Sequence, residues 1–260
     1  MLERIILRLS KKYKRQKQLS NVGAKIVNDP IYIESVQKST LEIEKRPYRF
    51  DIINFLLQKI NKPHSIYLEI GVRNPQENFD KIDAVTKYSV DPGFENKQNP
   101  VDFKMTSDDF FSALDSGKIL SKDNKFDLIF IDGLHLADQV ERDINNALRY
   151  IDDHGFIVLH DCNPPTEFHA RESYYYRNSP AHGLWNGTTW KAFYKARLNK
   201  SLFSCCIDTD WGLGIISKSK NIGMYAQVDN PFFEYHVFEA NRKDSLNLIS
   251  FDELQQKFNN

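Results

Sequence analysis

Residues 126–163 decide the fold, and they read FDLIFIDGLHLADQVERDINNALRYIDDHGFIVLHDCN. An apolar run stands at each end of this stretch, and each run finishes in polar side chains. Between the two runs, apolar residues recur at helical spacing, at Leu136, Val140, Ile144, Ala147, Leu148 and Ile151. Parallel strands that are buried on both faces are continuous apolar runs, so the stretch predicts a β-α-β unit.

The polar side chains that end the two predicted strands indicate a functional site. Asp132 and His135 follow the first strand, and His160, Asp161 and Asn163 end the second. In parallel α/β sheets, ligands sit just beyond the carboxyl ends of the strands. We therefore expect the acids and imidazoles of these two strand ends to share one site.

Strand and helix alternate from residue 65 to residue 160, which predicts a Rossmann-like, doubly wound α/β fold with a mostly parallel, seven-stranded sheet. Two strands at 202–207 and 211–217, with almost no helix between them, predict an antiparallel hairpin at one edge. The other expected elements are strands over 65–70, over 88–90 and near 101–105, and helices over 48–61, 76–84, 107–114, 188–198 and near 251–258.

Composition narrows the class of protein and partner. The chain has 260 residues, of which 41% are hydrophobic, and this is enough for a large core. A net charge of zero gives no electrostatic reason to expect a nucleic-acid partner. Three cysteines, two of them adjacent, are no disulfide framework and favour a reducing, cytoplasmic location. No apolar run has transmembrane length, and the first apolar run is too short for a signal peptide.

Residues 1–47 are expected to form a basic helical extension before the main domain (48–220), with a C-terminal extension (221–260) packed on that domain. Residues 2–18 predict an amphipathic helix with Leu2, Ile5, Ile6, Leu9 and Tyr13 on one side. Against Glu3, the first 17 residues hold Arg4, Arg8, Lys11, Lys12, Lys14, Arg15 and Lys17. Such a helix can contact a membrane surface or a protein, or it can be solvated and dock by its apolar side.

The first candidate binding motif is Glu69-Ile70-Gly71. Asp91 follows it at the end of the next predicted strand. A glycine after a strand lets the backbone approach a ligand, and an acid at the end of the next strand can accept both ribose hydroxyls of a nucleoside. The alternative is structural: Glu69 is then a strand-end carboxylate, and Asp91 belongs to an Asp-Pro-Gly turn.

The loop after Gly71 favours one type of nucleoside cofactor. A dinucleotide site needs further glycines where the pyrophosphate approaches the backbone, but this loop continues with Val72, Arg73, Asn74 and Pro75. S-adenosylmethionine has no phosphate, so one glycine suffices. The sequence therefore favours a methyl donor over NAD or FAD.

Several motifs together resemble class I S-adenosylmethionine-dependent methyltransferases, in a branch that modifies small molecules such as sugars and polyketides. They are LEIG at 68–71, VDP at 90–92, TSDDFF at 106–111, FDLIFIDGLH at 126–135, VLHDCNP at 158–164, WNGTTWKA at 185–192 and DWGLG at 210–214. The resemblance covers roughly residues 65–217. It implies S-adenosylmethionine as cofactor and O-methylation of a small acceptor, such as a glycan or a nucleotide-sugar.

The resemblance also implies roles for individual residues. Glu69 and Gly71 would lie near the methionine part of the donor, and Asp91 on its ribose. The adenine would lie near Thr106, Ser107 and Asp108, and the transfer site would be lined by Asp132 and His135. The sequence departs from the family at Pro75, where such enzymes usually have glycine.

O-methylation needs a group that removes the proton of the acceptor hydroxyl, and His135, His160 and Asp161 are the candidates. His135 stands past a glycine on a loop, with an unperturbed pKa near 6.5. His160 is expected to be buried, where a positive charge is costly, so we favour His135 as the base. A buried histidine with a backbone partner and an N-cap aspartate are the structural alternatives for His160 and Asp161.

A divalent cation is a further hypothesis. Asp132, Asp161 and Asn163 offer oxygen atoms at neighbouring strand ends, and oxygen ligands are those that Mg²⁺ prefers.

Residues 168–190 are rich in aromatic and polar side chains, which are typical of a substrate lid or of a packed surface loop. Two other functions remain open. One is a non-catalytic Rossmann-like scaffold with a weakened pocket, for which Pro75 is the evidence. The other is a nucleotide-dependent oxidoreductase, which the missing glycines disfavour.

Overall fold

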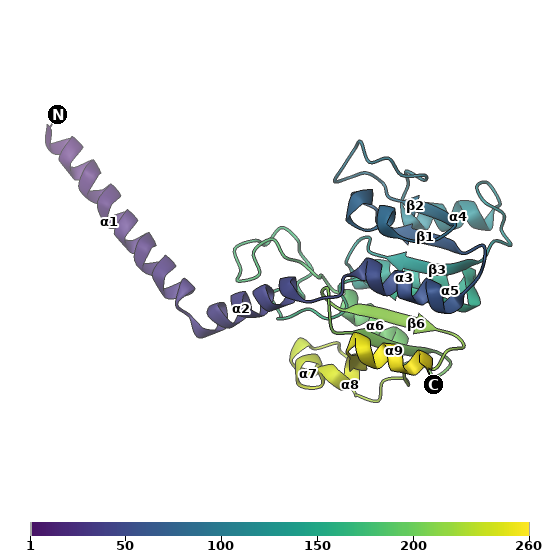
Figure 1. Cartoon of the computed structure of the whole chain (residues 1–260). Helices are drawn as coiled ribbons and strands as arrows, with labels where there is room; N and C mark the ends of the chain where they lie inside the picture. Colours follow the sequence, from purple (N-terminus) through teal and green to yellow (C-terminus); the bar gives the residue numbers. More distant parts are fainter. Residues whose placement is uncertain (1, 260) are drawn as a thin grey trace.

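A seven-stranded sheet in the order β2-β1-β3-β4-β6-β5-β7 forms the centre of the protein (Figure 1). The structure is a computed structural model that describes residues 2–259, and it describes side chains from residue 6 onward. The strands are β1 (Ile66–Ile70), β2 (Thr86–Val90), β3 (Phe126–Ile131), β4 (Ile151–Leu159), β5 (Phe203–Ile207), β6 (Leu213–Ser217) and β7 (Leu248–Ile249). Strand β6 runs antiparallel to both of its neighbours, and the remaining pairs are parallel. The predicted Rossmann-like fold is confirmed.

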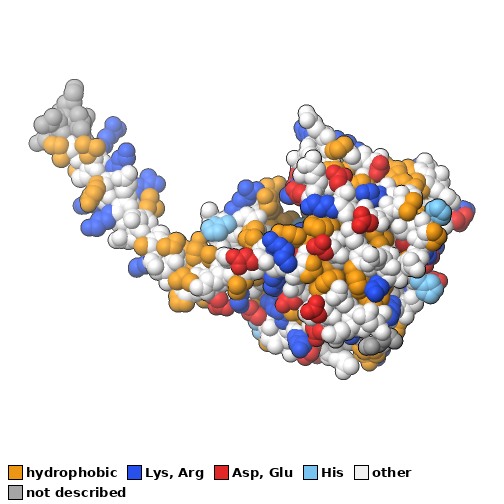
Figure 2. All heavy atoms as spheres, in the orientation of Figure 1, with side chains coloured by type: hydrophobic (Ala, Val, Ile, Leu, Met, Phe, Trp, Pro, Cys, Tyr) orange, Lys and Arg blue, Asp and Glu red, His pale blue; other side chains and the backbone are white. Residues whose placement is uncertain are grey.

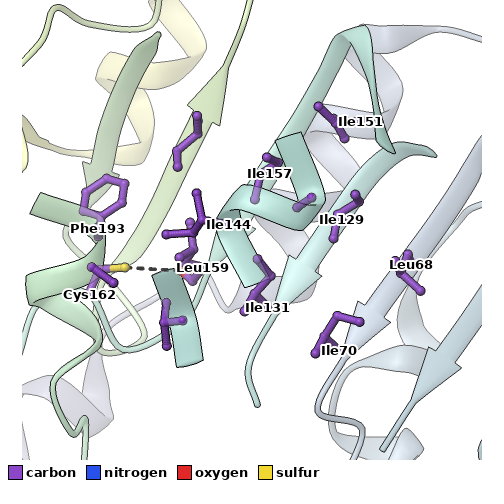
Figure 3. Close-up of a cluster of buried hydrophobic side chains, with 14 of the residues drawn as sticks. Leu68, Ile70, Ile129, Ile131, Ile144, Ile151, Ile157, Leu159, Cys162 and Phe193 are labelled. Carbon is purple, nitrogen blue, oxygen red and sulfur yellow. Dashed lines mark hydrogen bonds between the residues drawn. The ribbon is translucent and has the colours of Figure 1, made fainter. Parts of the chain in front are cut away.

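Helices cover the sheet on both faces. Helices α4 (Ser107–Asp115), α5 (Ala137–Tyr150) and α6 (Thr189–Arg197) pack on one face, and α3 (Arg49–Ile60) and α9 (Phe251–Asn259) pack on the other. Along β3, Ile129 and Ile131 belong to the first core, whereas Leu128 and Phe130 belong to the second. Figure 3 shows the first core, with Ile144 of α5 among the strand residues. Burial on both faces is the reason that these strands are continuous apolar runs.

Two expected elements differ in the structure. The helix expected over 76–84 is replaced by two short 3₁₀ turns, Pro75–Glu77 and Phe79–Lys81. Between them Asn78 has a non-helical backbone (φ −141°, ψ −60°) and buries its amide against Glu69, which accepts a hydrogen bond of 2.9 Å. The strand expected near 101–105 is reduced to one bridge between Phe103 and Val90.

The seventh strand is therefore β7, at the opposite edge of the sheet. It pairs with β5, so β7 is the edge strand and the β5–β6 hairpin lies one strand in from the edge. The C-terminal segment also contributes α7 (Tyr235–Ala240), α8 (Arg242–Leu246) and α9. Leu254 of α9 is fully buried, and Phe251 packs edge-on against Phe55 of α3. The last forty residues are thus part of the same core.

The N-terminal region contains two helices. Helix α1 (Leu2–Val27) extends well beyond the expected range and projects from the body, with every side chain described over 6–27 exposed (Figure 1). The interpretation in which it docks by its apolar side is therefore wrong for this structure. Helix α2 (Pro30–Glu44) begins after the N-cap Asp29 and packs on the body.

The three cysteines, Cys162, Cys205 and Cys206, are free and buried. Within residues 2–259, no helix combines the length and the apolar character needed to cross a membrane.

Candidate active site

A cavity of about 520 Å³ opens at the carboxyl ends of the parallel strands. Its wall includes residues at the carboxyl ends of β1, β2, β3 and β4, together with residues from α3 and from the loop 164–187, which we call the cap loop. Among the lining residues are Arg49, Glu69, Gly71, Asp91, Thr106, Ser107, Asp132, His135, His160, Asp161, Tyr174, Trp185 and Trp211. Asp108 and Asn163, two predicted site residues, are not among them.

Gly71 is required where β1 meets the cavity. Its φ is +93°, and a Cβ built there would lie 2.2 Å from the carbonyl oxygen of Asp132. Any side chain would both strain this backbone and collide with the loop that leaves β3. The glycine therefore sets the close approach of two loops that line the cavity.

Glu69 is a buried carboxyl group on the cavity wall, 3% exposed. Its Oε2 accepts hydrogen bonds from Tyr67 (2.5 Å) and Asn78 (2.9 Å). Burial raises the pKa of Glu69 to about 7, against the opposing effect of these two donors. Because both hydrogen bonds described for this carboxyl group end on Oε2, Oε1 is left to accept from a ligand.

Asp91 stands at the end of β2, half-buried on the cavity wall. Its Oδ1 accepts the backbone N–H of Gly93 at 2.6 Å, so the turn expected from Asp-Pro-Gly is present. Burial raises the pKa of Asp91 above its usual value. Asp91 thus stabilises the turn and also lines the cavity.

The start of α4 meets the cavity through Thr106 and Ser107 but not through Asp108. Thr106 caps the helix, accepting from the backbone N–H of Asp109 at 3.2 Å. Asp108 faces the solvent and forms an ion pair with Arg142 of α5 at 3.2 Å. Its place one residue into the helix turns its carboxylate toward α5, so the contact with adenine that the resemblance implies has no support in the geometry.

Beyond the ends of β3 and β4, six side chains form what we call the strand-end cluster: Arg49, Asp132, His135, His160, Asp161 and Asp210. The Arg49 guanidinium joins Asp132 (2.6 Å) and Asp210 (2.9 Å). His160 contacts three carboxylates at 3.1–3.2 Å, those of Asp132, Asp161 and Asp210. His135 lies 3.0 Å from Asp161 and 3.4 Å from Asp132.

The carboxylates of this cluster control the charge of its imidazoles. Burial and the Arg49 charge oppose protonation of His160, but the neighbouring carboxylates outweigh both and hold its pKa well above the usual value. Burial likewise opposes protonation of His135, yet Asp161 and Asp132 raise its pKa. His160 is buried as expected and burial does oppose its charge, but Asp161 and Asp132, which the sequence argument did not weigh, raise its pKa.

Strained backbone supports the cluster. Asp161, Asp210 and Trp211 all have positive φ, at 61°, 43° and 64°. A bulky residue such as tryptophan rarely adopts this conformation, and such strain persists where the surroundings fix it. Here Glu42 of α2 accepts the backbone N–H of Trp211 at 2.9 Å, and Asn186 donates to Asp161 at 2.8 Å.

The cap loop adds an aromatic wall beside His135. The ring of Trp185 stacks on the His135 imidazole with 5.2 Å between centroids and 14° between planes, and Tyr174 packs against Trp185. Gly187, at φ +60°, lets this segment reach the carbonyl oxygen of His135, where a Cβ would be 2.0 Å away. The loop is therefore fitted to the cluster rather than loosely exposed.

Helix α2 braces the other side of the cap loop. His169 is fully buried between Ser39 of α2 and Thr166, with 2.9 Å to each hydroxyl. Burial lowers the pKa of His169 to about 4, so its imidazole is neutral at physiological pH. Pro75, expected to reshape the first loop, starts a 3₁₀ turn and is not among the residues that line the cavity.

The donor set for a cation differs from the expected one. Ligand atoms of Asp132, His135 and Asp161 lie within 4.8 Å of one another. Asn163 has its amide between Asp208 (3.1 Å) and Arg242 (2.6 Å), so the structure does not bring it to these acids. The set present, two carboxylates and one imidazole, fits a divalent cation with mixed oxygen and nitrogen ligands.

Two functional candidates were missed by the sequence analysis. Asp210 belongs to the DWGLG motif, so a signal for it was present. Arg49 is the first residue of α3. The apolar spacing of this segment predicted the helix, but no sequence pattern indicates that the Arg49 side chain belongs to a site.

Comparison with known proteins identifies the central segment. Residues 64–162 match the family model described as a methyltransferase domain. No curated protein matches the chain.

Similar solved structures include a putative O-methyltransferase from Klebsiella pneumoniae, with 15% identity, a TM-score of 0.39, and coverage of 76% of this chain and 94% of that chain. An O-methyltransferase from Bacillus cereus in complex with SAH has 14% identity, a TM-score of 0.40, and the same coverage of 76% and 94%. A methyltransferase from Podospora anserina has 15% identity, a TM-score of 0.42, and coverage of 78% and 96%.

The segment matched by the family model contains β1 to β4 and the polar side chains at their carboxyl ends. By this match, residues 64–162 are similar to a methyltransferase domain, and they lie within a seven-stranded, Rossmann-like sheet.

Proposed function

We propose that this methyltransferase transfers the methyl group of S-adenosylmethionine to a hydroxyl group of a small acceptor. One observation carries the proposal: a single cavity joins two chemically different walls. The first, which we call the donor side, consists of Glu69, Gly71 and Asp91. The second is the strand-end cluster with the aromatic rings of the cap loop.

The donor side fits the polar groups of S-adenosylmethionine. The methionine part carries an ammonium group. This group can donate a hydrogen bond to Oε1 of Glu69. The ribose hydroxyls suit Asp91, as in other nucleoside sites at strand ends. Gly71 and Ser107 line the same cavity, and we assign the adenine to the side of Ser107.

His135 is the group we assign to accept the proton of the acceptor hydroxyl. Its Nδ1 lies 3.0 Å from Asp161 and 3.2 Å from the carbonyl oxygen of Trp185, so both neighbours favour a proton on Nδ1. Asp161 and Asp132 raise the pKa of His135, so the neutral imidazole becomes more abundant as pH rises, and in that form this tautomer has its lone pair on Nε2 for the acceptor proton. Nε2 lies 3.4 Å from Asp132, whose charge stabilises the imidazolium that forms.

His160 serves a different purpose in this proposal. It is already held as an imidazolium by three carboxylates, so it has no lone pair for a substrate proton. Its charge and that of Arg49 keep Asp132 and Asp210 ionised, and the pKa values of both acids lie well below the usual range. His160 and Arg49 are thus positioning residues for the acids that orient His135.

A bound divalent cation is a second hypothesis, and the net negative charge of the strand-end cluster supports it. Three carboxylates face one guanidinium, and a charge of −2 remains when both imidazoles are neutral. Two protons or one divalent cation would compensate it. Asp132, Asp161 and His135 would hold the ion, which would act as a Lewis acid on the acceptor oxygen.

The acceptor class follows from the cap loop. Trp185 and Tyr174 present aromatic surface beside His135 on the cavity wall. Aromatic faces suit the C–H surface of a sugar ring or a planar ring. We therefore propose a glycan, a nucleotide-sugar or a phenolic acceptor.

Asp91→Ala is expected to weaken the binding of S-adenosylhomocysteine. Two charge-assisted hydrogen bonds to the ribose contribute roughly 1.5–3 kcal/mol each, so the loss should be roughly 3–6 kcal/mol. Calorimetric titration measures it, with the exposed Asp83→Ala as the matched control and NAD as the comparison ligand. Parent-like affinity in Asp91→Ala would show that the ribose assignment is wrong.

The affinity for S-adenosylhomocysteine should also depend on pH through Glu69. The ammonium group of the ligand needs the ionised carboxylate, and the pKa of Glu69 is raised to about 7. Affinity should therefore rise as pH increases through 7, and it should be about tenfold weaker at pH 6 than at pH 8. Glu69→Gln, which keeps the hydrogen bonds from Tyr67 and Asn78, should remove this dependence. A pH profile unchanged by Glu69→Gln would exclude the contact.

His135→Ala should lower turnover and leave the donor site intact. General-base catalysis typically contributes about 10²–10⁴-fold, and the rate should fall by a factor in that range. Transfer of labelled methyl groups to a panel of hydroxylated sugars and phenols measures turnover, with the exposed His154→Ala as control. A small change in rate, or the loss of S-adenosylhomocysteine binding in a folded variant, would argue against this role.

The cation hypothesis predicts that exhaustive chelation lowers turnover and that Mg²⁺ or Mn²⁺ restores it, with donor affinity unchanged. Asp161→Asn, which keeps the size of the side chain but removes its charge, should abolish the restoration. Full activity after chelation, with metal content verified by elemental analysis, would rule the cation out.

A further inference from the structure

Helix α1 is a long, basic and solvent-exposed element that the proposed reaction does not use. Its 26 residues span about 39 Å at 1.5 Å per residue. Between Glu3 and Asp29 the sequence has eight Lys or Arg residues and no acid. Along the described part of the projecting helix, Figure 2 shows Lys and Arg side chains in blue beside apolar side chains in orange. Such a charge surplus contrasts with a chain whose net charge is zero.

In the first half of α1, an apolar stripe lies on one side of the helix and most of the cations lie away from it. Ile6, Leu9 and Tyr13 follow one another at spacings of three and four residues, which places them on one side. They are 59%, 61% and 66% exposed. Arg8, Lys11 and Arg15 fall on the opposite side by their helical angles, whereas Leu7 falls on the side of these cations and Lys17 on the side of the stripe. An apolar stripe with cations on the other face is the pattern of a helix that lies in a membrane interface.

We propose that α1 binds the surface of a membrane that contains anionic phospholipids. The stripe of Ile6, Leu9 and Tyr13 would enter the headgroup region, and the cations would lie among the lipid phosphates. Neither the donor side nor the strand-end cluster takes part, so the proposal is independent of the proposed reaction.

Charge and spacing favour a lipid surface over a second copy of the chain. A coiled-coil seam through Ile6, Leu9 and Tyr13 would continue at Gln16, Ser20 and Gly23, and these positions bury little apolar surface. The flanking positions of two parallel copies would bring Lys12 of one copy against Lys17 of the other, and no acid between Glu3 and Asp29 would compensate them. An anionic bilayer would bury the apolar stripe and would also compensate the positive charge of α1.

The attachment of α1 keeps it away from the body. Asp29 caps α2 and Pro30 starts it, so the chain turns between the two helices. Helix α2 is fixed by Ser35 and Ser39, whose hydroxyls contact Thr166 and His169 of the cap loop at 3.1 and 2.9 Å. A membrane-bound α1 would therefore be connected through α2 to the loop that lines the cavity.

Co-sedimentation of the full-length chain with vesicles tests the proposal. The chain should bind vesicles of phosphatidylcholine with phosphatidylserine, should bind pure phosphatidylcholine much more weakly, and should dissociate at high salt. Lys11→Gln/Lys12→Gln/Lys14→Gln should weaken binding by about a hundredfold, at about fivefold per cation. Ile6→Ser/Leu9→Ser should weaken it by about tenfold or more.

Matched controls lie on the body and on α2. Lys118→Gln/Lys122→Gln/Lys200→Gln removes the same charge from exposed positions, and Leu41→Ser/Ile43→Ser removes exposed apolar surface from α2. Both should bind vesicles like the parent. The absence of binding to anionic vesicles, or equal losses in test and control variants, would overturn the proposal. A concentration-dependent dimer in sedimentation that Ile6→Ser/Leu9→Ser abolishes, without lipid binding, would assign α1 to a second copy instead.

Discussion

The convergence of three carboxylates on Arg49 and His160 is the interaction on which the rest of the site depends. Asp132, Asp161 and Asp210 come from three different segments of the chain and would repel one another without these cations. Breaking a buried pair by removing one partner typically costs about 3–5 kcal/mol, because the other charge stays buried and uncompensated. The cluster therefore fixes how the ends of β3 and β4, the β5–β6 turn and the start of α3 meet.

The same cluster is connected to helix α2 and to the cap loop. Glu42 of α2 holds the backbone of Trp211, next to Asp210, and Asn186 of the cap loop holds Asp161. Trp185 stacks on His135 from the same loop. Segments far apart in sequence thus set the orientation of one imidazole, and this is the preorganisation that proton transfer requires.

The fold was predictable because its signals are local and periodic. The continuous apolar runs of β3 and β4 and the helical spacing of α5 identify the β-α-β unit, and chain order places Asp132 and Asp161 at the same edge of the sheet. Gly71 and Asp91 were likewise predictable, since turn chemistry and strand ends are visible in sequence. The structure brings all four to one cavity.

The misses have a common physical cause, which is tertiary contact. Asn163 follows Asp161 by two residues, yet Arg242 and Asp208 turn its amide away from the acids. Burial of the Asn78 amide against Glu69 replaces an expected helix with two 3₁₀ turns. His160 also contacts the carboxylate of Asp210, some fifty residues further along the chain. Local patterns carry no information on any of these partners.

The crystal structure of the chain in complex with S-adenosylhomocysteine tests the central claim most directly. The account predicts that the ligand lies in the cavity at the carboxyl ends of β1 to β4, with its ribose on Asp91 and its amino group on Glu69. Its sulfur atom should face the side of the cavity that holds His135. A ligand bound elsewhere, or one whose sulfur faces away from the strand-end cluster, would contradict the account.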